Sequence, residues 1–292
     1  MRKIKEFIIE KSLLSSALIT IAVTFGIISV LTVEAFQFFS EVSIIEFFTD
    51  TQWTPLFTDK HYGILPLLSG TLLISFIAIS VALPVGLSIS IYLSEYAPKS
   101  FRRTVKPLLE LLAAVPTVVY GFFALIVVTP FLQQFIPGLS GFNSLSAGIV
   151  MGIMIIPFVS SISEDALHAV PKDLREASYG MGATKLQTAF KVVVPAASSG
   201  IIVSIILAIS RAIGETMIVA IAAGQQPRLT LDPTVPVETI TAYIVQVSLG
   251  DVQHGSIEYR TIFAAGITLF VFTFLLNTLS YRIRKKYQEK YE

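Results

Sequence analysis

The sequence contains no cysteine, only three histidines, and few charged residues. Without cysteine the chain forms neither a disulfide nor a thiolate-ligated metal site. His61, His168 and His254 lie far apart without the spacing of metal ligands, so we expect solvated loop residues and predict no metal site. No nucleophile with a matched base is evident, and we predict no catalytic residue. Acids and bases nearly balance at a net charge of +1, which gives no indication of nucleic-acid binding.

Apolar residues take the place of the missing charge. Hydrophobic residues make up 53% of the chain and charged residues 14%, where a soluble domain carries about 25% charged residues. About 20 consecutive apolar residues cross a bilayer as an α-helix. Such segments lie at Leu13–Val33, Leu65–Leu93, Leu108–Leu132, Leu145–Ser163, Gly200–Ala223 and Thr261–Ile283. Prolines inside three of them predict kinks: Pro84, Pro116 and Pro157. The sequence therefore predicts an all-α integral membrane protein with about six transmembrane helices.

The charged residues predict the orientation of these helices. Lys and Arg gather at the N-terminus, at residues 99–106 and 172–191, and in the tail from Arg282, while acids dominate the alternate loops. Basic loops stay in the cytoplasm. The first apolar segment exceeds the roughly 7–15 residues of a signal-peptide core, so we expect it to be retained. We therefore predict a multi-pass membrane protein with both termini cytoplasmic.

The chain divides into two parts. Residues 1–64 hold the N-terminal end, the first span and an aromatic-rich outer segment, and residues 65–292 hold the core of the other five predicted spans, with the polar stretch 164–195. In the outer segment, Ser43 and Glu46 have the spacing of a capping box, which predicts a short interfacial helix with its aromatics at headgroup level. Anchoring to membrane lipid and contact with an outside partner both remain open for this segment.

The longest polar stretch on the predicted inner side, residues 164–195, is typical of two short helices. Pro171 suits the first turn of one helix, and a pair of glycines ends it. Thr184 and Gln187 have the spacing of a capping box for a second helix, which ends near Pro195. From composition alone, a docking element and a plain connector are equally plausible.

A resemblance distinguishes these two interpretations. The run Glu176-Ala177-Ser178, followed by Gly182 and by Val192, Val194 and Pro195, resembles the EAA signature of ABC importer permeases. It departs from that signature at Ser178 and in having Val for the usual Ile and Leu. The resemblance implies a type I ABC importer permease fold, in which this loop is the coupling helix that docks on a cytoplasmic ATPase. It implies coupling roles for Pro171, Glu176, Ala177, Ser178, Gly182 and Pro195.

Further motifs resemble the Pst family of phosphate permeases. They are Phe47-Phe48-Thr49, Trp53, Pro55, Tyr62-Gly63-Ile64-Leu65-Pro66, Gly70-Thr71, Ser75, Pro84, Leu93-Ser94-Glu95, and residues 114–121 in the third span. Residues 211–217, Arg-Ala-Ile-Gly-Glu-Thr-Met, resemble the C-type subunit more than the A-type subunit, in which Gly-Glu-Thr is followed by Ala-Pro.

The resemblance implies three partners: an A-type permease subunit, a cytoplasmic ATPase dimer and an extracytoplasmic phosphate-binding protein. This chain has no Gly-x-x-x-x-Gly-Lys-Ser/Thr motif, which is the phosphate-binding loop of ATPases. We therefore expect a non-hydrolytic permease subunit that needs no cofactor of its own, with ATP-Mg bound by the partner ATPase.

Two charges lie near the middle of the predicted fifth span. A central charge costs about 2.5–3.5 kcal/mol to insert, so Arg211 and Glu215 need partners or a function. At i,i+4 spacing we expect them on one helix face, where an internal salt bridge is one interpretation. We favour transport, with Arg211 as a donor fork for phosphate and Glu215 holding it or accepting a proton. Weaker candidates for lining the same path, for which packing is the alternative, are Thr216, Thr117 and Tyr120.

Other functions remain open. The nearest is an ABC permease for another oxyanion such as sulfate or molybdate, because the coupling loop indicates the class of transporter and not its substrate. A secondary transporter or channel would explain the spans without an ATPase, although we find no convincing inverted repeat. A membrane enzyme built around Glu164, Asp165 and His168 is a third alternative, against a role of these residues in anchoring the coupling loop.

Overall fold

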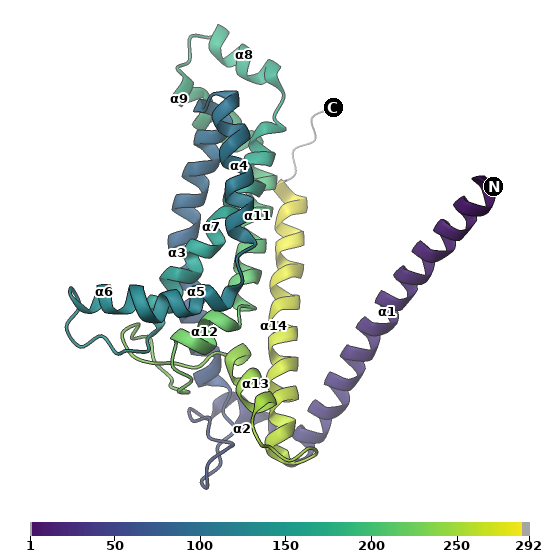
Figure 1. Cartoon of the computed structure of the whole chain (residues 1–292), viewed down its shortest axis with the longest axis vertical. Coiled ribbons are helices and arrows are strands. Elements are labelled where there is room, and N and C mark those ends of the chain that lie inside the picture. Colours follow the sequence, from purple (N-terminus) through teal and green to yellow (C-terminus); the bar gives the residue numbers. More distant parts are fainter. Residues whose placement is uncertain (1, 288–292) are drawn as a thin grey trace.

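The computed structural model describes the backbone of residues 2–287 and the side chains of residues 5–282. Within these residues the regular structure is helical, apart from two isolated β-bridges, Trp53–Tyr62 and Gly224–Val237. Most long helices lie side by side along the longest axis, whereas α1 diverges from them (Figure 1). The first turn of α1 and the last turn of α14 lie toward the same end of the molecule. The predicted all-α class is confirmed.

Four helices are long and apolar enough to cross a bilayer without interruption. They are α1 (Arg2–Glu41), α3 (Leu65–Ile91, continued by the π-helical turn η1, Tyr92–Tyr96), α7 (Ser144–His168) and α14 (Ile257–Tyr287). The prolines Pro84 and Pro157 lie inside α3 and α7, as expected. The first, second, fourth and sixth predicted spans therefore correspond to continuous helices.

The third and fifth spans are broken. The kink predicted at Pro116 is a break between two helices, and the uninterrupted helix expected for the fifth span is wrong. The third consists of α4 (Lys99–Ala113) and then α5 (Thr117–Phe123), η2 (Ala124–Val128) and α6 (Thr129–Gln133), with a bend of 84° between α4 and α5. Pro116 caps α5 because a proline, which lacks an N–H, cannot continue the ladder of α4. The count of six spans holds if each bent pair is one span.

The predicted fifth span, Gly200–Ala223, is interrupted once, and a further bend lies just before it. The chain bends by 71° between α9 (Lys185–Thr188), η3 (Ala189–Val193) and α10 (Val194–Ala196) on one side and α11 (Ser198–Ile213) on the other. After Ile213 three residues separate α11 from a short helix, α12 (Met217–Ala222). In Figure 1, α5, α6 and α12 lie across the long helices.

The centre of the molecule is the α3–α7 pair, which packs closely through glycine. A Cβ at Gly152 would lie 2.7 Å from the carbonyl oxygen of Ala78, and a Cβ at Gly86 would lie 2.8 Å from Val159. Small residues at such contacts let helix backbones approach closely in a membrane. The core around them is buried and includes Ile74, Ala78, Val150, Met151, Met154 and Ile155. The pair therefore forms a tightly packed unit.

The outer segment folds into an aromatic cluster. Phe38, Phe47 and Trp53 are at most 1% exposed, and Trp53 packs edge-on against Tyr243 of α13 (Ile240–Leu249) with ring centroids 5.0 Å apart. These three side chains therefore pack inside the chain, and the expected headgroup level of the segment stays a prediction. The predicted short helix exists as α2 (Ile44–Thr49), but the side chain of Ser43 makes no capping hydrogen bond.

The predicted two-helix loop is present at the end of the molecule opposite this cluster (Figure 1). Its first helix is α8 (Lys172–Gly180), and its second runs from α9 to the end of α10 at Ala196. The loop is shorter than predicted, because α7 continues through Glu164 to His168.

Candidate functional site

Arg211 lies in the last turn of α11, level with the middle of α7. Its Nη2 is 3.9 Å from Met154 Sδ, and its guanidinium carbon is 5.9 Å from the centroid of the Phe158 ring. The side chain is exposed on the chain surface. Among the described residues it forms no ion pair, so an internal salt bridge with Glu215 is not what the structure contains.

Glu215 has a different position from the one expected. The predicted i,i+4 pair on one helix face is wrong, because α11 ends at Ile213 and Glu215 lies in the break. Its side chain is buried, and Oε1 accepts hydrogen bonds from the backbone N–H groups of Met217 at 3.1 Å and Ile218 at 3.4 Å. A carboxylate satisfies and stabilises the free N–H groups at a helix start. Glu215 therefore holds the start of α12 and leaves Arg211 unpaired.

The three weaker candidates also lie at the helix breaks. Tyr120 donates from its hydroxyl to the Leu112 carbonyl at 3.0 Å, across the bend between α4 and α5. Thr216 donates to the Gly214 carbonyl at 3.3 Å, and Thr117 begins α5 in a partly buried position. The Tyr120 hydroxyl thus adds to the Leu112 carbonyl, which already accepts from the backbone N–H of Val115 at 3.3 Å, and links α5 to the last turn of α4. The Thr216 hydroxyl bonds within the break itself.

The two breaks are brought together in space. The helices that follow them, α5 and α12, pack so closely that a Cβ at Gly121 would lie 3.2 Å from the Met217 carbonyl oxygen. The predicted path residues of the third and fifth spans therefore share one region near the middle of the helices. In that region Arg211 is the side chain whose charge is left without a counter-ion, which suits it to an anion.

The two short helices of the α8–α10 loop are joined by side-chain and backbone hydrogen bonds. Ser178 Oγ lies 2.9 Å from Thr188 Oγ1, so the serine that departs from the EAA signature links the helices. The predicted capping box is confirmed, with Thr184 and Gln187 bonded in both directions. Gly182 turns the chain with φ +82°, a conformation that favours glycine. Exposed positions include the predicted coupling residues Pro171, Glu176, Ala177, Gly182 and Pro195.

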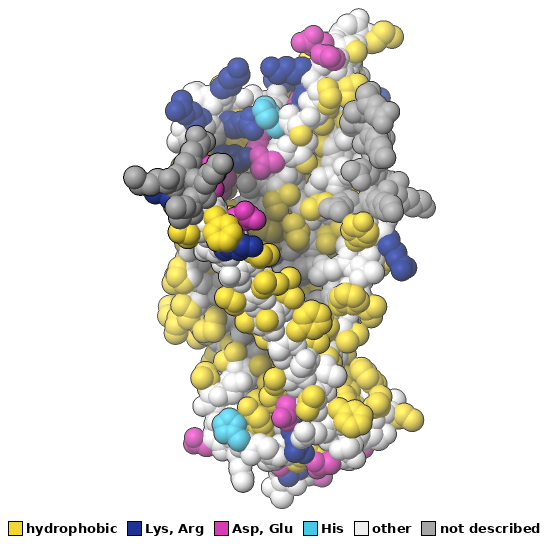
Figure 2. Space-filling view, turned by 90° about the vertical axis from the view of Figure 1, so that its right-hand side faces the viewer, with side chains coloured by type: hydrophobic (Ala, Val, Ile, Leu, Met, Phe, Trp, Pro, Cys, Tyr) yellow, Lys and Arg dark blue, Asp and Glu magenta, His cyan; other side chains and the backbone are white. Residues whose placement is uncertain are grey.

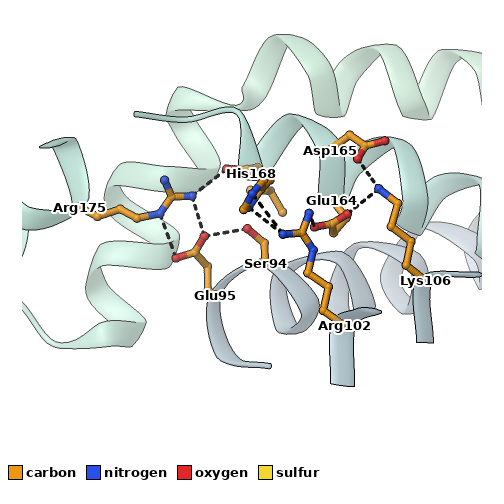
Figure 3. Close-up of polar contacts among 9 residues, drawn as sticks. Ser94, Glu95, Arg102, Lys106, Glu164, Asp165, His168 and Arg175 are labelled. Atoms are coloured by element: carbon orange, nitrogen blue, oxygen red, sulfur yellow. Dashed lines mark hydrogen bonds and ion pairs between the residues drawn. The ribbon is translucent and has the colours of Figure 1, made fainter. Parts of the chain in front are cut away.

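An ion pair fixes α8 to the helices below it (Figure 3). Arg175 donates from Nη2 to Glu95 Oε1 at 2.9 Å and from Nε to Glu95 Oε2 at 3.3 Å. The same guanidinium donates to the carbonyl groups of Leu167 at 2.8 Å and Val170 at 2.5 Å. Because Glu95 belongs to η1 and Leu167 to α7, this arginine ties the loop to both members of the α3–α7 pair.

A second network beside it joins α4 to α7 (Figure 3). Glu164, whose side chain is 1% exposed, pairs with Arg102 at 2.5 Å and with Lys106 at 2.9 Å. Lys106 also pairs with Asp165, and Arg102 Nη1 lies 3.1 Å from His168 Nδ1. The acids and histidine that suggested an enzyme are thus used in helix anchoring. Sequence reasoning missed Arg102 and Lys106 as their partners, and Arg175 as the partner of Glu95, because only the fold brings α4 and α8 to the end of α7.

The described residues contain no group of three or more His, Cys, Asp or Glu side chains able to hold a metal ion. His61 instead pairs with Asp50 at 2.8 Å, and the His254 ring packs against Tyr259 with centroids 4.6 Å apart. His61 and His254 lie in loops as predicted, whereas the prediction is wrong for His168, which is the last residue of α7.

Comparison with known proteins identifies related sequences over most of the chain. Residues 82–289 match the family described as binding-protein-dependent transport system inner membrane component. A probable ABC transporter permease protein, YqgH of Bacillus subtilis (strain 168), is 38% identical over 90% of this chain and 85% of its own length. The phosphate transport system permease protein PstC of Mesorhizobium japonicum is 36% identical over 80% of this chain and 76% of its own length. The PstC protein of Haemophilus influenzae is 33% identical, covering 83% and 82% of the two chains.

Solved structures share the fold at lower identity. A chain of a bacterial alginate ABC transporter, in complex with an alginate pentasaccharide-bound periplasmic protein, matches with a TM-score of 0.63 and 19% identity. That match covers 94% of this chain and 95% of the other. A chain of the MetNI methionine ABC transporter, in an inward facing conformation, matches with a TM-score of 0.59, 18% identity, and coverage of 77% and 96%. These matches show that the chain has the same overall fold as these chains of ABC transporters.

Proposed function

The chain belongs to the family of binding-protein-dependent transport system inner membrane components, and on that premise we propose that it forms half of the membrane pathway of an ATP-driven phosphate importer, as the C-type permease subunit. The observation that supports phosphate as the transported solute is the set of relatives named PstC. They are 36% and 33% identical over about four fifths of this chain. The fold alone does not decide the substrate, because the structural neighbours belong to importers of methionine and alginate.

Arg211 supports an oxyanion as the transported solute. Its guanidinium lies exposed at the broken fifth span and has no counter-ion in the described part of the chain. The planar fork of an arginine binds two oxygens of a phosphate at once. In this proposal Arg211 contacts the phosphate directly, whereas Glu215, Thr216, Thr117 and Tyr120 hold the backbone of the breaks around it.

The loop that contains α8 supports coupling to a separate ATPase. The sequence has no nucleotide-binding Gly-x-x-x-x-Gly-Lys-Ser/Thr motif, so energy must come from another polypeptide that binds ATP-Mg. Glu176, Ala177 and Ser178 lie on a helix that projects from the bundle and is tied to it by Arg175. The remaining proposed partners are an A-type permease subunit and an extracytoplasmic phosphate-binding protein. This chain is then a transport component without hydrolytic activity.

The positive charge at the α8 end of the molecule supports a cytoplasmic position for α8. The first half of α4 contains Lys99, Arg102, Arg103 and Lys106, and α8 begins with Lys172; these residues line one groove. Figure 2 shows Lys and Arg side chains gathered at one end of the molecule. Lys and Arg are retained on the cytoplasmic side of a membrane. The first turn of α1 and the last turn of α14, which lie toward the same end, are then cytoplasmic.

Reconstitution tests the proposal. The chain is assembled in proteoliposomes with an A-type permease subunit, an ATPase and a phosphate-binding protein from the same organism. ATP-dependent uptake of labelled phosphate, sulfate and molybdate is then measured. We expect phosphate uptake that needs ATP and the binding protein, with at most about 1% of that rate for sulfate, a difference of roughly 2.7 kcal/mol. Preferred uptake of sulfate or molybdate would instead identify the alternative oxyanion permease, and uptake without ATP would indicate a secondary transporter.

A further inference from the structure

A basic groove lies at the α8 end of the molecule, away from Arg211. It has a volume of about 590 Å³ and lies between the first half of α4 and the end of α7. Its basic lining consists of Lys99, Arg102, Arg103, Lys106, His168 and Lys172. Figure 2 shows Lys and Arg side chains gathered at this end of the surface. Neither the helix anchoring nor the transport pathway described above accounts for all of these cations.

The cations of α4 lie on one face because of their spacing. Lys99, Arg102, Arg103 and Lys106 occupy positions i, i+3, i+4 and i+7, which stack on one side of an α-helix. Lys172, the first residue of α8, adds a fifth positive charge to the same groove. Like charges gathered this closely repel one another, so the arrangement favours an anionic ligand.

The neighbouring acids neutralise only part of this charge. Glu164 and Asp165 pair with Arg102 and Lys106. In the described part of the chain Lys99, Arg103 and Lys172 have no ion-pair partner, and all are exposed. The one acid that lines the groove itself is Glu110. The groove therefore keeps an excess of positive charge with three uncommitted cations.

The paired cations are held in place, which suits a binding site. Glu164 is buried and fixes both Arg102 and Lys106, so their side chains are already ordered before a ligand arrives. Ordering charged donors in advance lowers the entropy lost on binding. Arginine and lysine together provide the donor fork and the point charge that bind phosphate oxygens.

The groove lies where α4 changes from charged to apolar. Leu108, Leu111 and Leu112, in the second half of the same helix, are 53%, 65% and 50% exposed. An apolar exposed surface directly below a basic groove places that groove at the boundary between the hydrocarbon layer and the lipid headgroups.

We propose that this groove binds a phosphate group, supplied either by the headgroup of an anionic phospholipid or by inorganic phosphate on the inner side of the membrane. Lys99, Arg103 and Lys172 contact the phosphate oxygens, while Arg102 and Lys106, held by Glu164, form the floor of the site. The site is separate from Arg211 and does not depend on the solute that the protein transports.

A variant in which the three uncommitted cations are replaced by neutral side chains tests the site. The triple variant Lys99→Gln, Arg103→Gln, Lys172→Gln removes the uncommitted cations and leaves the Glu164 network intact. The control Lys185→Gln, Lys191→Gln, Arg228→Gln removes the same charge from exposed positions outside the groove. Both are made in full-length chain that also carries Arg211→Gln, so that the central arginine does not contribute to phosphate binding.

Two ligands are measured on the purified proteins. Native mass spectrometry counts bound phosphatidylglycerol against phosphatidylcholine, and equilibrium dialysis measures binding of labelled inorganic phosphate after delipidation. We expect the groove variant to bind phosphatidylglycerol or phosphate at least about tenfold more weakly than its parent, and the control to stay within about twofold. The ligand whose affinity falls identifies the source of the phosphate group.

Equal binding of both ligands by the parent and the groove variant would overturn the proposal. So would an equal loss in the control variant, because binding would then follow net charge alone. If the triple variant does not assemble, Arg103→Gln alone replaces it, with an expected loss of about threefold. Unchanged ligand binding with weaker retention of the ATPase would assign the groove to a protein contact instead.

Discussion

Arg211 is the residue that, in the proposed function, contacts the transported phosphate. Replacement by Gln removes the charge while keeping a polar side chain of similar length. Because a charge-assisted hydrogen bond contributes about 1.5–3 kcal/mol, we expect phosphate uptake by the reconstituted complex to fall about tenfold to a hundredfold. Assembly should be retained, because the contacts of Arg211 with Met154 and Phe158 are few and the side chain is exposed.

The conservative variant Arg211→Lys separates charge from geometry. It keeps the positive charge but loses the planar fork, so we expect uptake between that of wild type and that of Arg211→Gln. Uptake by Arg211→Gln within about twofold of wild type, at equal amounts of assembled complex, would rule out Arg211 as a phosphate ligand. Loss of assembly in both variants would show that this residue is structural.

Glu238 provides a test of stability at the opposite end of the molecule. It precedes the N-cap of α13, outside the membrane-spanning helices, and is 2% exposed. Burial raises the pKa of its carboxyl from 4.5 to about 8. Since the folded chain then holds the proton more tightly than the unfolded chain, stability is greatest below about pH 4.5 and falls as the pH rises to about 8.

The variant Glu238→Gln should lack the part of the pH-dependent fall in stability that Glu238 causes, and should be more stable than wild type at pH 8. Thermal unfolding of the purified proteins in detergent between pH 5 and pH 8.5 measures the two stabilities. The control Asp251→Asn alters an exposed acid of a nearby loop and should keep the wild-type pH profile. Parallel profiles of wild type and Glu238→Gln would mean that the carboxyl of Glu238 ionises freely in the folded protein.

At the scale of single residues the sequence located the unusual charges but not their partners. The position of Arg211 near the centre of an apolar segment could be predicted from hydropathy. The role of Glu215 could not, because it depends on where α11 ends, and Gly214 inside an apolar run is a weak signal of a helix end. The pairing of Glu95 with Arg175 joins residues 80 positions apart, which no local pattern indicates.

Among the elements, α8 and its turn are predicted to be the most sensitive to a small change. Gly182 has φ +82° and no atom within 4 Å of the place where a Cβ would lie. Gly182→Val therefore introduces backbone strain of about 1–3 kcal/mol without a steric clash with the bundle. We expect the variant to insert into the membrane normally and to lose phosphate uptake, because the α8–α9 turn is displaced.

The matched control is Gly180→Ala, which adds a Cβ to open space in the last residue of α8 without a positive φ. It should transport phosphate at about the wild-type rate. Uptake and retention of the ATPase are measured for both variants. Normal transport by Gly182→Val with full ATPase retention would contradict the role of this turn in coupling.

The ion pair between Arg175 and Glu95 is predicted to connect α8 to the bundle mechanically. Glu95→Gln leaves the arginine with its carbonyl partners Leu167 and Val170 but removes the counter-charge. Breaking a largely buried pair costs about 3–5 kcal/mol at most, so we expect folded protein with ATP hydrolysis less tightly coupled to uptake. The ratio of phosphate imported to ATP hydrolysed measures it.

A loss of ATPase activity in proportion to uptake would argue against this connecting role for Glu95. The exposed acid Asp173, in the first turn of α8, offers a control. The variant Asp173→Asn should leave the ratio of phosphate imported to ATP hydrolysed unchanged. We expect that no substitution of Arg175 restores the ratio in the Glu95→Gln background. Among the described residues, no other buried acid lies beside the Arg175 guanidinium.

Element boundaries were predictable where a local signal exists. The capping box at Thr184 and Gln187 predicted the start of α9, and the apolar runs predicted the continuous spans. The breaks in the third and fifth spans were not predicted, because a hydropathy window does not distinguish one straight helix from two short ones. Pro116 did indicate a disturbance, but only packing of α5 against α12 converts a kink into a bend of 84°.

For the whole molecule, the orientation in the membrane is the prediction that remains. The chain has no native cysteine, so single substitutions report cleanly. Met181, next to α8, is 89% exposed, and Leu231, in the loop after α12, is 82% exposed. In intact cells an impermeant thiol reagent should label Leu231→Cys and should label Met181→Cys only after the cells are opened. The reverse pattern would invert the proposed topology.

The glycine-packed α3–α7 pair also has a consequence for how motion passes through the molecule. An α-helix of 25 residues, such as α7, is about 37 Å long. At the end of the pair away from α8, α3 is held where Gly70 packs on the Glu238 carbonyl. At the other end of the pair, Arg175 joins it to α8. A rod of this length that is pivoted at one end tilts by about 3° when its other end moves by about 2 Å. Its midpoint, where Met154 contacts Arg211, is then displaced by about 1 Å, so a small movement of the loop changes the surroundings of the central arginine without unwinding a helix.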